Sequence, residues 1–310
     1  MRFITFSAFS RADSELRSLA LVVLVACAAF SLSACGGGGS GPTTKPVKLV
    51  GEVLGPPDQV LTSSLKASAG YSGSLDTARA IQRAGQAPML DMLFMLPSAS
   101  ATAGQHYAIH PDAEQRLIAF VRANADLLKP GVRVLIHDEM YWNPNGSPDS
   151  AEALQPQLDA LTQAVALMRL HAPQVSVGIT ITPSGSIGRP MTLAFIQRAV
   201  ALVDWVGTDP YWFGDVAGIP NLNEWTRTFP LLARAANPRV ETWLIAQAFK
   251  DPAWDVQAFN GLMRSQLLQA ANYDHIIFFG WQFVSELPAS YAGVNFTDDT
   301  RRIYAAYLKL

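Results

Sequence analysis

From Pro46 onward, short apolar runs alternate with longer stretches whose apolar residues recur at helical spacing. Most of the short runs are apolar throughout, which is typical of strands covered on both faces. Seven strands are predicted on this basis: Lys48–Leu54, Met89–Leu96, Val132–Glu139, Ser176–Pro183, Asp204–Tyr211, Glu241–Phe249 and His275–Phe283.

Helices are predicted between these strands, near residues 75–85, 111–128, 149–171, 190–202, 222–236, 255–271 and 298–309. Pro111-Asp112 and Pro148-Asp149 open two of them, because proline suits the first turn of a helix. Lys129-Pro130-Gly131 and Asn237-Pro238 close two others.

Strands that alternate with helices form a parallel sheet with right-handed crossovers. An open, doubly wound sheet usually carries a G-x-G-x-x-G turn or a P-loop, and this sequence has neither. The sequence therefore favours an α/β fold of the (β/α)8 TIM-barrel type, as a single domain over residues 46–310. The eighth strand is expected in Gln59–Ser72 or around Gln105–Ile109.

The first 45 residues have a different composition. Arginines at 2, 11 and 17 precede an uncharged apolar run, Leu19–Leu32, which is the length of a secretory signal rather than of a membrane span. We interpret residues 1–34 as a signal peptide. The glycine-rich segment 35–45 is predicted to be a flexible tether.

Leu32-Ser33-Ala34-Cys35 resembles the lipobox of bacterial lipoproteins. The resemblance implies cleavage before Cys35, acylation of that cysteine with fatty acids such as palmitate, and attachment to a membrane of the cell envelope. Gly36 after the cysteine implies sorting to the outer membrane. Cys27 lies inside the apolar run and would be removed with the signal peptide.

Charge narrows the range of partners. Without residues 1–34 the chain keeps 20 basic side chains (23 − 3) and 23 acidic ones (25 − 2), a net charge of −3. With no Lys/Arg run, a nucleic-acid partner is not expected. The five histidines lack the spacing of a zinc motif. We expect a monomer with no metal and no cofactor.

Acids, amides and aromatic residues gather where the predicted strands end. Asp138 and Glu139 follow the third predicted strand, Asp209 and Tyr211 end the fifth, and Gln247 is near the end of the sixth. In a parallel barrel these ends form one mouth, where active sites lie. Sugar rings stack on aromatic rings, and their hydroxyl groups bind carboxylates and amides, so we expect a carbohydrate site.

Three motifs, Asp138-Glu139, Gly207–Trp212 and Trp243–Phe249, resemble in order and spacing the glycoside-hydrolase-type (β/α)8 barrels, most of all the poorly characterised members. The resemblance implies that Glu139 is the acid/base glutamate that follows the fourth barrel strand. Retaining members place a nucleophilic glutamate near the end of the seventh strand, where this chain has Gln247. Asp209, Glu286 and Asp138 remain as candidates for the second carboxylate. An inverting or substrate-assisted reaction also remains open.

The hypothesis is therefore a glycoside hydrolase that acts on a polysaccharide or glycan at the cell envelope. The alternatives are a barrel that binds glycans without catalysis, which Gln247 favours, and a structural lipoprotein of the envelope.

In an ideal strand only one of Asp138 and Glu139 faces the mouth. Glu241, at the start of its strand, and Trp225, on a helix, are interpreted as structural. The predicted substrate-binding residues are Asp138, Tyr141, Trp142, Tyr211, Trp212, Gln247, Trp281 and Gln282, with Glu52 as a further mouth residue.

Overall fold

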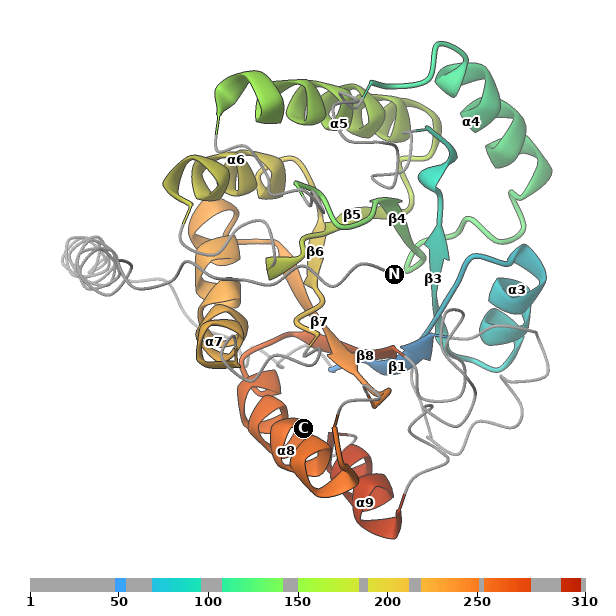
Figure 1. The fold of residues 1–310 in the computed structure, drawn as a ribbon. Coiled ribbons are helices and arrows are strands. Elements are labelled where there is room, and N and C mark those ends of the chain that lie inside the picture. The colour runs from blue at the N-terminus through green and yellow to red at the C-terminus, as the bar shows by residue number, and fades with distance from the viewer. Residues whose placement is uncertain are drawn as a thin grey trace, which may run out of the picture. The chain divides into compact units, whose positions relative to one another are not determined.

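Eight parallel strands close into a barrel in chain order, with β8 pairing with β1 (Figure 1). The computed structural model describes residues 48–53, 69–95, 108–141, 150–183, 189–211, 219–250, 254–279 and 297–307. The strands are β1 (Val50–Val53), β2 (Ala69–Ser72), β3 (Ala87–Asp91), β4 (Arg133–His137), β5 (Ser176–Thr180), β6 (Trp205–Thr208), β7 (Glu241–Gln247) and β8 (His275–Phe279).

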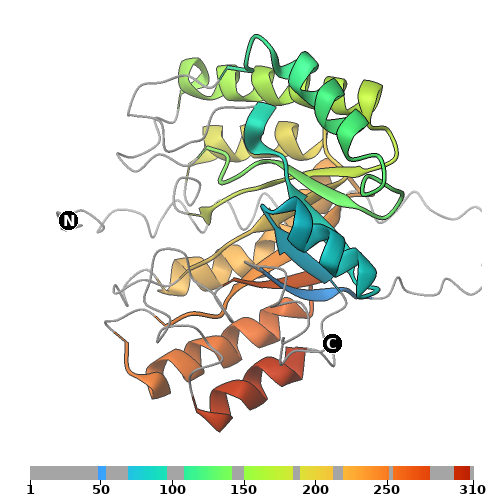
Figure 2. The same ribbon diagram turned by 90° about the vertical axis from the view of Figure 1, so that its right-hand side faces the viewer.

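Helices lie outside the strands, as the side view in Figure 2 shows. They are α3 (Leu75–Arg83), α4 (Ala113–Ala123), α5 (Ala151–His171), α6 (Pro190–Val200), α7 (Ile219–Ala236), α8 (Val256–Ala270) and α9 (Asp298–Tyr307). All seven predicted helices are present, and the predicted fold class is confirmed. No helix in the described ranges is both long and apolar enough to cross a membrane.

The eighth strand is β2, which lies in the first of the two segments where it was expected. Its four residues pair with β1 on one side and with β3 on the other. The sequence Ala-Gly-Tyr-Ser is too short and too mixed to predict a strand by itself. The neighbouring strands supply the hydrogen-bond partners of β2, and these hydrogen bonds help to close the barrel.

Strand β3 is shorter than predicted. It ends at Asp91, and a single 3₁₀ turn, η1 (Leu93–Met95), follows. The Asp91 carboxylate accepts a hydrogen bond from the backbone N–H of Leu93 at 3.0 Å. An aspartate that binds the backbone two residues later favours a turn over a continuing strand.

Two apolar layers hold the barrel. The larger lies between the strands and the helices and includes Trp225, as predicted. The smaller fills the barrel interior with Ala69, Met89, Leu135, Trp205, Trp243 and Ile277. Trp205 requires a glycine at position 178, because a Cβ there would lie 2.0 Å from the indole ring.

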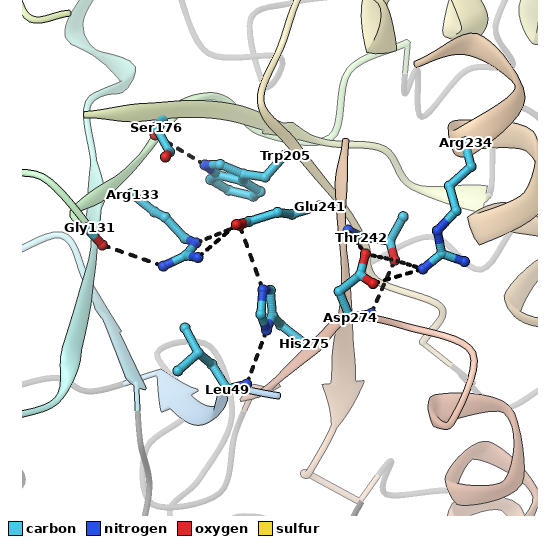
Figure 3. A network of polar contacts seen from close by, with 10 residues as sticks. All are labelled: Leu49, Gly131, Arg133, Ser176, Trp205, Arg234, Glu241, Thr242, Asp274 and His275. Atoms are coloured by element: carbon cyan, nitrogen blue, oxygen red, sulfur yellow. Dashed lines mark hydrogen bonds and ion pairs between the residues drawn. The ribbon is translucent and has the colours of Figure 1, made fainter. Parts of the chain in front are cut away.

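A polar network occupies the N-terminal end of the barrel (Figure 3). Arg133 of β4 binds both carboxylate oxygens of Glu241 of β7, at 2.8 and 3.0 Å, and its guanidinium lies 5.3 Å from the centre of the Trp243 ring. His275 of β8 accepts a hydrogen bond from the Leu49 N–H at 3.0 Å. Glu241 therefore joins strands at this end of the barrel, which leaves the opposite end for a functional site.

Candidate active site

Four carboxyl groups lie at the C-terminal ends of the strands. Asp91 ends β3, Asp138 and Glu139 follow β4, and Asp209 follows β6. The electrostatic interactions among them connect Asp91 to Asp138, and Asp209 to both Asp138 and Glu139. Residues from three strands are thus brought together, as the barrel fold predicts for its mouth.

A bulge near the end of β4 sets the direction of Asp138. Leu135 is opposite Gly178, but the next pair joins His137 to Ile179, so β4 contains one extra residue at this point. The extra residue shifts the in–out alternation by one position. Asp138 therefore faces the same side as Thr180, whose hydroxyl donates a hydrogen bond to its carboxylate. His137, a neighbour by sequence, is 3% exposed.

Glu139 adopts a left-handed backbone conformation, with φ of 48°. Such a conformation costs a non-glycine residue about 1–2 kcal/mol. The Glu139 N–H donates to the Thr180 hydroxyl at 2.7 Å, which helps to hold the turn. Strained backbone of this kind is common at functional sites. Our expectation that only one of Asp138 and Glu139 faces the mouth is therefore wrong, because the bulge and this turn end the alternation of an ideal strand.

Asp209 and Glu139 form a carboxyl pair. Asp209 is 5% exposed, and its side chain hydrogen-bonds to that of Glu139. Burial raises the pKa of Asp209 well above its ordinary value, and the negative charges of Glu139 and Asp138 raise it further. Two carboxylates in contact cannot both ionise readily, so the pair holds one proton between them. The other Asp209 oxygen, Oδ1, is buried and has no hydrogen-bond partner.

A second pair, Tyr71 and Asp91, was missed by the sequence analysis. The Tyr71 hydroxyl donates to Asp91 at 3.2 Å. Burial raises the pKa of Asp91, and the charge of Asp138 adds to this effect, while the Leu93 N–H opposes it. Asp91 lies inside the apolar run Met89–Leu96, which was predicted as one strand, so no local pattern marks it as a strand end. Tyr71 lies on β2, the strand that the pattern did not reveal.

Burial among these groups also raises the pKa of Asp138. The hydrogen bonds from the Thr180 hydroxyl and the Glu139 N–H act in the opposite direction, because they stabilise the ionised form. The Asp138 residue is nevertheless exposed to water, which weakens the effect of burial on its pKa. We therefore expect a smaller rise in pKa at Asp138 than at Asp209.

Aromatic rings from three strand ends stand beside the acids. Tyr211 stacks on Phe279 with ring centres 5.5 Å apart, and it meets Phe249 edge-on at 5.4 Å. Phe249 and Phe279 also touch edge-on, at 5.8 Å. The charges of Asp209, Asp138 and Glu139 act on Tyr211, so this aromatic cluster adjoins the carboxyl groups. Tyr211 was a predicted site residue, whereas Phe249 and Phe279 were not.

Gln247 and Tyr141, both predicted substrate contacts, are each 1% exposed. The Gln247 amide donates to the Phe249 carbonyl at 3.0 Å and so helps to hold the backbone of Phe249 in place. Tyr141 donates to the Phe195 carbonyl of α6 at 3.3 Å and packs edge-on against the Phe195 ring. The assignment of Tyr141 as a substrate contact is therefore corrected: its backbone, with φ of 67°, places the ring in the core.

Several predicted residues lie outside the described ranges and stay predictions: Cys35, Trp142, Trp212, Trp281, Gln282 and Glu286. The side chain of Glu52 also lies outside them. Within the described part of the chain, no three His, Cys, Asp or Glu side chains are arranged to hold a metal ion.

No protein-family model matches the sequence, and no curated protein matches it either. Glycoside hydrolases with (β/α)8 barrels are among the solved structures with similar folds. A psychrophilic family 10 endo-β-1,4-xylanase has a TM-score of 0.59 and 9% identity, over 83% of this chain and 96% of its own. A putative α-L-fucosidase from Bacteroides thetaiotaomicron has a TM-score of 0.55 and 11% identity, over 90% and 98%.

The active domain 2 of a chitinase from Pyrococcus furiosus has a TM-score of 0.50 and 11% identity, over 87% of this chain and 98% of its own. At such low identity these similarities establish the fold alone. Function has to be argued from the site itself.

Proposed function

We propose that this protein is a glycoside hydrolase that acts on a polysaccharide or glycan, with Glu139 as the general acid. The Glu139–Asp209 pair at the barrel mouth is the observation that carries this proposal. Glycosidic bond cleavage needs a carboxylic acid that is still protonated near neutral pH, so that it can protonate the leaving oxygen. A carboxyl pair that shares one proton provides such an acid.

The two members of the pair have different tasks. Asp209 is buried, whereas Glu139 is half-buried and can reach a ligand in the mouth. We therefore assign proton delivery to Glu139: the shared proton passes from Asp209 to Glu139 across their hydrogen bond, and Glu139 gives it to the leaving oxygen. Tyr211 and Phe279 are half-buried and would present ring surface to the apolar side of a sugar, whereas Phe249, which is 2% exposed, packs against them within the fold.

Asp209 is too close to Glu139 to be its partner across the scissile bond. That partner lies about 5–5.5 Å from the acid in retaining enzymes and farther away in inverting ones, beyond hydrogen-bonding distance. Among the described residues, Asp91 is the better candidate, because it lies at the mouth, is acted on by the charge of Asp138 and is not a member of the Glu139–Asp209 pair. Glu286 is the candidate outside the described ranges.

The first test compares reducing-end release from a panel of bacterial and plant polysaccharides by the wild type and by Glu139→Gln. We expect release by the wild type and a loss of about 100-fold or more in the variant. The matched control is Glu152→Gln, an exposed glutamate in the first turn of α5, which should keep full activity. Equal release by the wild type and Glu139→Gln would remove Glu139 from the mechanism.

A glycan-binding barrel without catalysis is the second candidate. Gln247 favours it, because an amide stands where retaining barrels place their nucleophile, and that amide is bound to the Phe249 carbonyl. Glycan binding by the wild type without any release would support this alternative. If neither binding nor release is found, a structural role in the envelope would be the better hypothesis.

We also propose that the protein is attached to the cell envelope through a lipid on Cys35, as the sequence Leu32–Cys35 suggests. Several acyl chains on one cysteine bind a bilayer firmly. Cys35→Ser should therefore move the protein from the membrane fraction to the soluble fraction of expressing cells, and should abolish labelling with radioactive palmitate. Unchanged fractionation and labelling would contradict the proposed anchor.

A further inference from the structure

Among the described residues, three carboxyl groups of the mouth, Asp91, Asp138 and Asp209, have no positively charged partner. The groups that act on Asp91, Asp138 and Asp209 are other acids, the Tyr71 and Thr180 hydroxyls and backbone N–H groups. In the described part of the chain, no Lys, Arg or His acts on any of these three carboxyl groups. Buried or crowded acids in proteins are usually paired, so this arrangement is unusual for a site that only has to remain folded.

The segments that connect strand ends to the following helices also contain more acidic than basic residues, although one of the acids, Asp112, is paired with Arg116 of α4. From β3 onward these segments contain nine Asp or Glu residues and only two Lys or Arg residues. The two cations are Arg189, next to the start of α6, and Lys250, whose ammonium group donates to the Trp254 carbonyl at 2.6 Å. The acids are Asp112, Asp138, Glu139, Asp149, Asp209, Asp215, Asp251, Asp255 and Glu286.

Asp209 adds an observation of a different kind. Its Oδ1 atom has no hydrogen-bond partner, although the residue is only 5% exposed. Trp205 and Gly207 face the barrel interior from β6, and Asp209, one residue beyond the strand, continues the same alternation and also faces inward. A buried acceptor without a donor costs free energy, and a donor from a ligand would remove that cost.

We infer that the glycan bound at this mouth carries free amino groups, so that a protonated sugar amine lies among Asp91, Asp138 and Asp209. This inference rests on the proposed function and specifies its substrate class as cationic amino-sugar polymers. An ammonium group supplies both a positive charge for these carboxyl groups and an N–H donor for Asp209 Oδ1. Tyr211 and Phe279 are half-buried, and the ring surface that their stacking leaves open adds a favourable contact for a cation.

The same charges discriminate against other glycans. A uronic acid or a sulfated sugar would place a negative charge beside Asp91, Asp138 and the charge that the Glu139–Asp209 pair retains, and such contacts give specificity by repulsion. A neutral or N-acetylated sugar offers hydroxyl or amide donors but leaves the negative charge unbalanced. Preference for the amine over its own acetamide is therefore the property that separates this inference from general sugar binding.

The experiment uses the purified full chain in detergent and polysaccharides in matched pairs. Each pair is a partially N-deacetylated polymer and the same polymer after chemical N-acetylation, and polygalacturonate is the anionic probe. Binding and reducing-end release are measured at low salt and with about 0.5 M NaCl, which screens exposed charges. We expect about tenfold or greater preference for the free-amine member of a pair, reduced by salt, and no binding of polygalacturonate.

Variants test whether the mouth carboxyl groups cause the preference. Asp138→Asn removes one charge but keeps an acceptor for the Thr180 hydroxyl, so it should lower the preference several-fold while the melting temperature stays close to the wild-type value. Asp159→Asn removes the same charge from the outer surface of α5 and should leave the preference unchanged. A preference that is equal in the wild type and Asp138→Asn would overturn the inference.

The outcomes separate this inference from the proposed function. Cleavage of neutral polymers as well as or better than their free-amine partners would overturn the inference and leave the glycosidase proposal standing. Selective binding of the free-amine polymers without cleavage would support the inference and contradict the hydrolase. Failure to bind any member of the panel would overturn the inference.

Discussion

At the scale of single residues, two neighbouring acids differ because their surroundings differ. Glu139 is half-buried in a strained turn, whereas Asp209 is buried behind it with one oxygen unpaired. The folded protein holds a proton on Asp209 more tightly than the unfolded chain does, since its pKa is raised. The stability that depends on this proton is present below about pH 4 and is lost as the pH rises through the raised pKa.

Asp209→Asn should therefore stabilise the protein at pH 8 by about 1 kcal/mol or more, because it removes a buried carboxyl group that has to ionise or stay protonated. Thermal unfolding would report this as a rise of about 2–4 °C per kcal/mol for a chain of this size. The gain should shrink toward pH 4. The same variant should lose hydrolytic activity, because an amide cannot hold the shared proton.

An Asp209→Asn variant that melts below the wild type at every pH would contradict this account of the pair. Asp159→Asn serves as the control for the loss of one carboxylate. Asp159 is exposed on α5, so its substitution should leave the melting temperature nearly unchanged at both pH values.

At the scale of elements, the end of β4 and the end of β5 act together. The bulge turns Asp138 toward the mouth, and the Thr180 hydroxyl of β5 binds both the Asp138 carboxylate and the Glu139 N–H. Thr180 is 2% exposed. One hydroxyl group therefore fixes the positions of two acids that a regular strand would point in opposite directions.

Thr180→Val keeps the shape of this side chain and removes its hydroxyl group. We expect it to cost about 1–3 kcal/mol of stability and to lower activity about 100-fold, because the two acids lose their common support. Thr180→Ser restores the hydroxyl and should recover most of the activity. Unfolding in urea and initial hydrolysis rates measure the two effects.

Thr162→Val is the matched control for the loss of a threonine hydroxyl. This exposed residue of α5 donates to the Leu158 carbonyl within its own helix, at 2.7 Å. The control should change neither stability nor activity appreciably. If Thr180→Val keeps wild-type activity, Thr180 does not position the acids.

At the scale of the whole molecule, the two ends of the barrel have opposite characters. The N-terminal end is closed by Arg133, Glu241 and His275, which join β4, β7 and β8, and His275 also binds the backbone just before β1 (Figure 3). The C-terminal end carries carboxyl groups whose charges are not balanced in the described part of the chain. Stabilising interactions and candidate chemistry are thus separated along the barrel axis.

The histidine in this closure predicts acid sensitivity. Burial lowers the pKa of His275 to about 4, so the folded state binds fewer protons than the unfolded state. The stability that depends on neutral His275 is fully present above about pH 6.5 and is lost as the pH falls toward 4. The free energy of unfolding should fall by about 2–3 kcal/mol over this range. Chemical unfolding at pH 7, 5.5 and 4.5 would measure it.

His275→Asn should flatten this pH dependence while keeping an acceptor for the Leu49 N–H. Burial also lowers the pKa of His137 to about 4, so part of the slope should remain until His137 is replaced as well. An unchanged slope in the variant with both replacements would show that the acid sensitivity comes from other groups.

The sequence by itself determined the architecture of the barrel and the end at which its acids meet. Continuous apolar runs and helical spacing are local properties, so seven strands and seven helices could be predicted from them. The positions of Glu139, Asp209 and Tyr211 followed from the same pattern, because the carboxyl ends of parallel strands share one edge. The four residues of β2 carry no such local signal and were placed only within a broader segment.

Tertiary structure alone decided which of these side chains meet. The bulge in β4 depends on pairing with β5, and it reverses the side that Asp138 faces. The pairing of Glu139 with Asp209, the bond between Tyr71 and Asp91, and the burial of Tyr141 each join residues on different elements. The register and packing of separate strands cause these contacts, and the pKa of each acid depends on them. No local pattern in the sequence encodes that register.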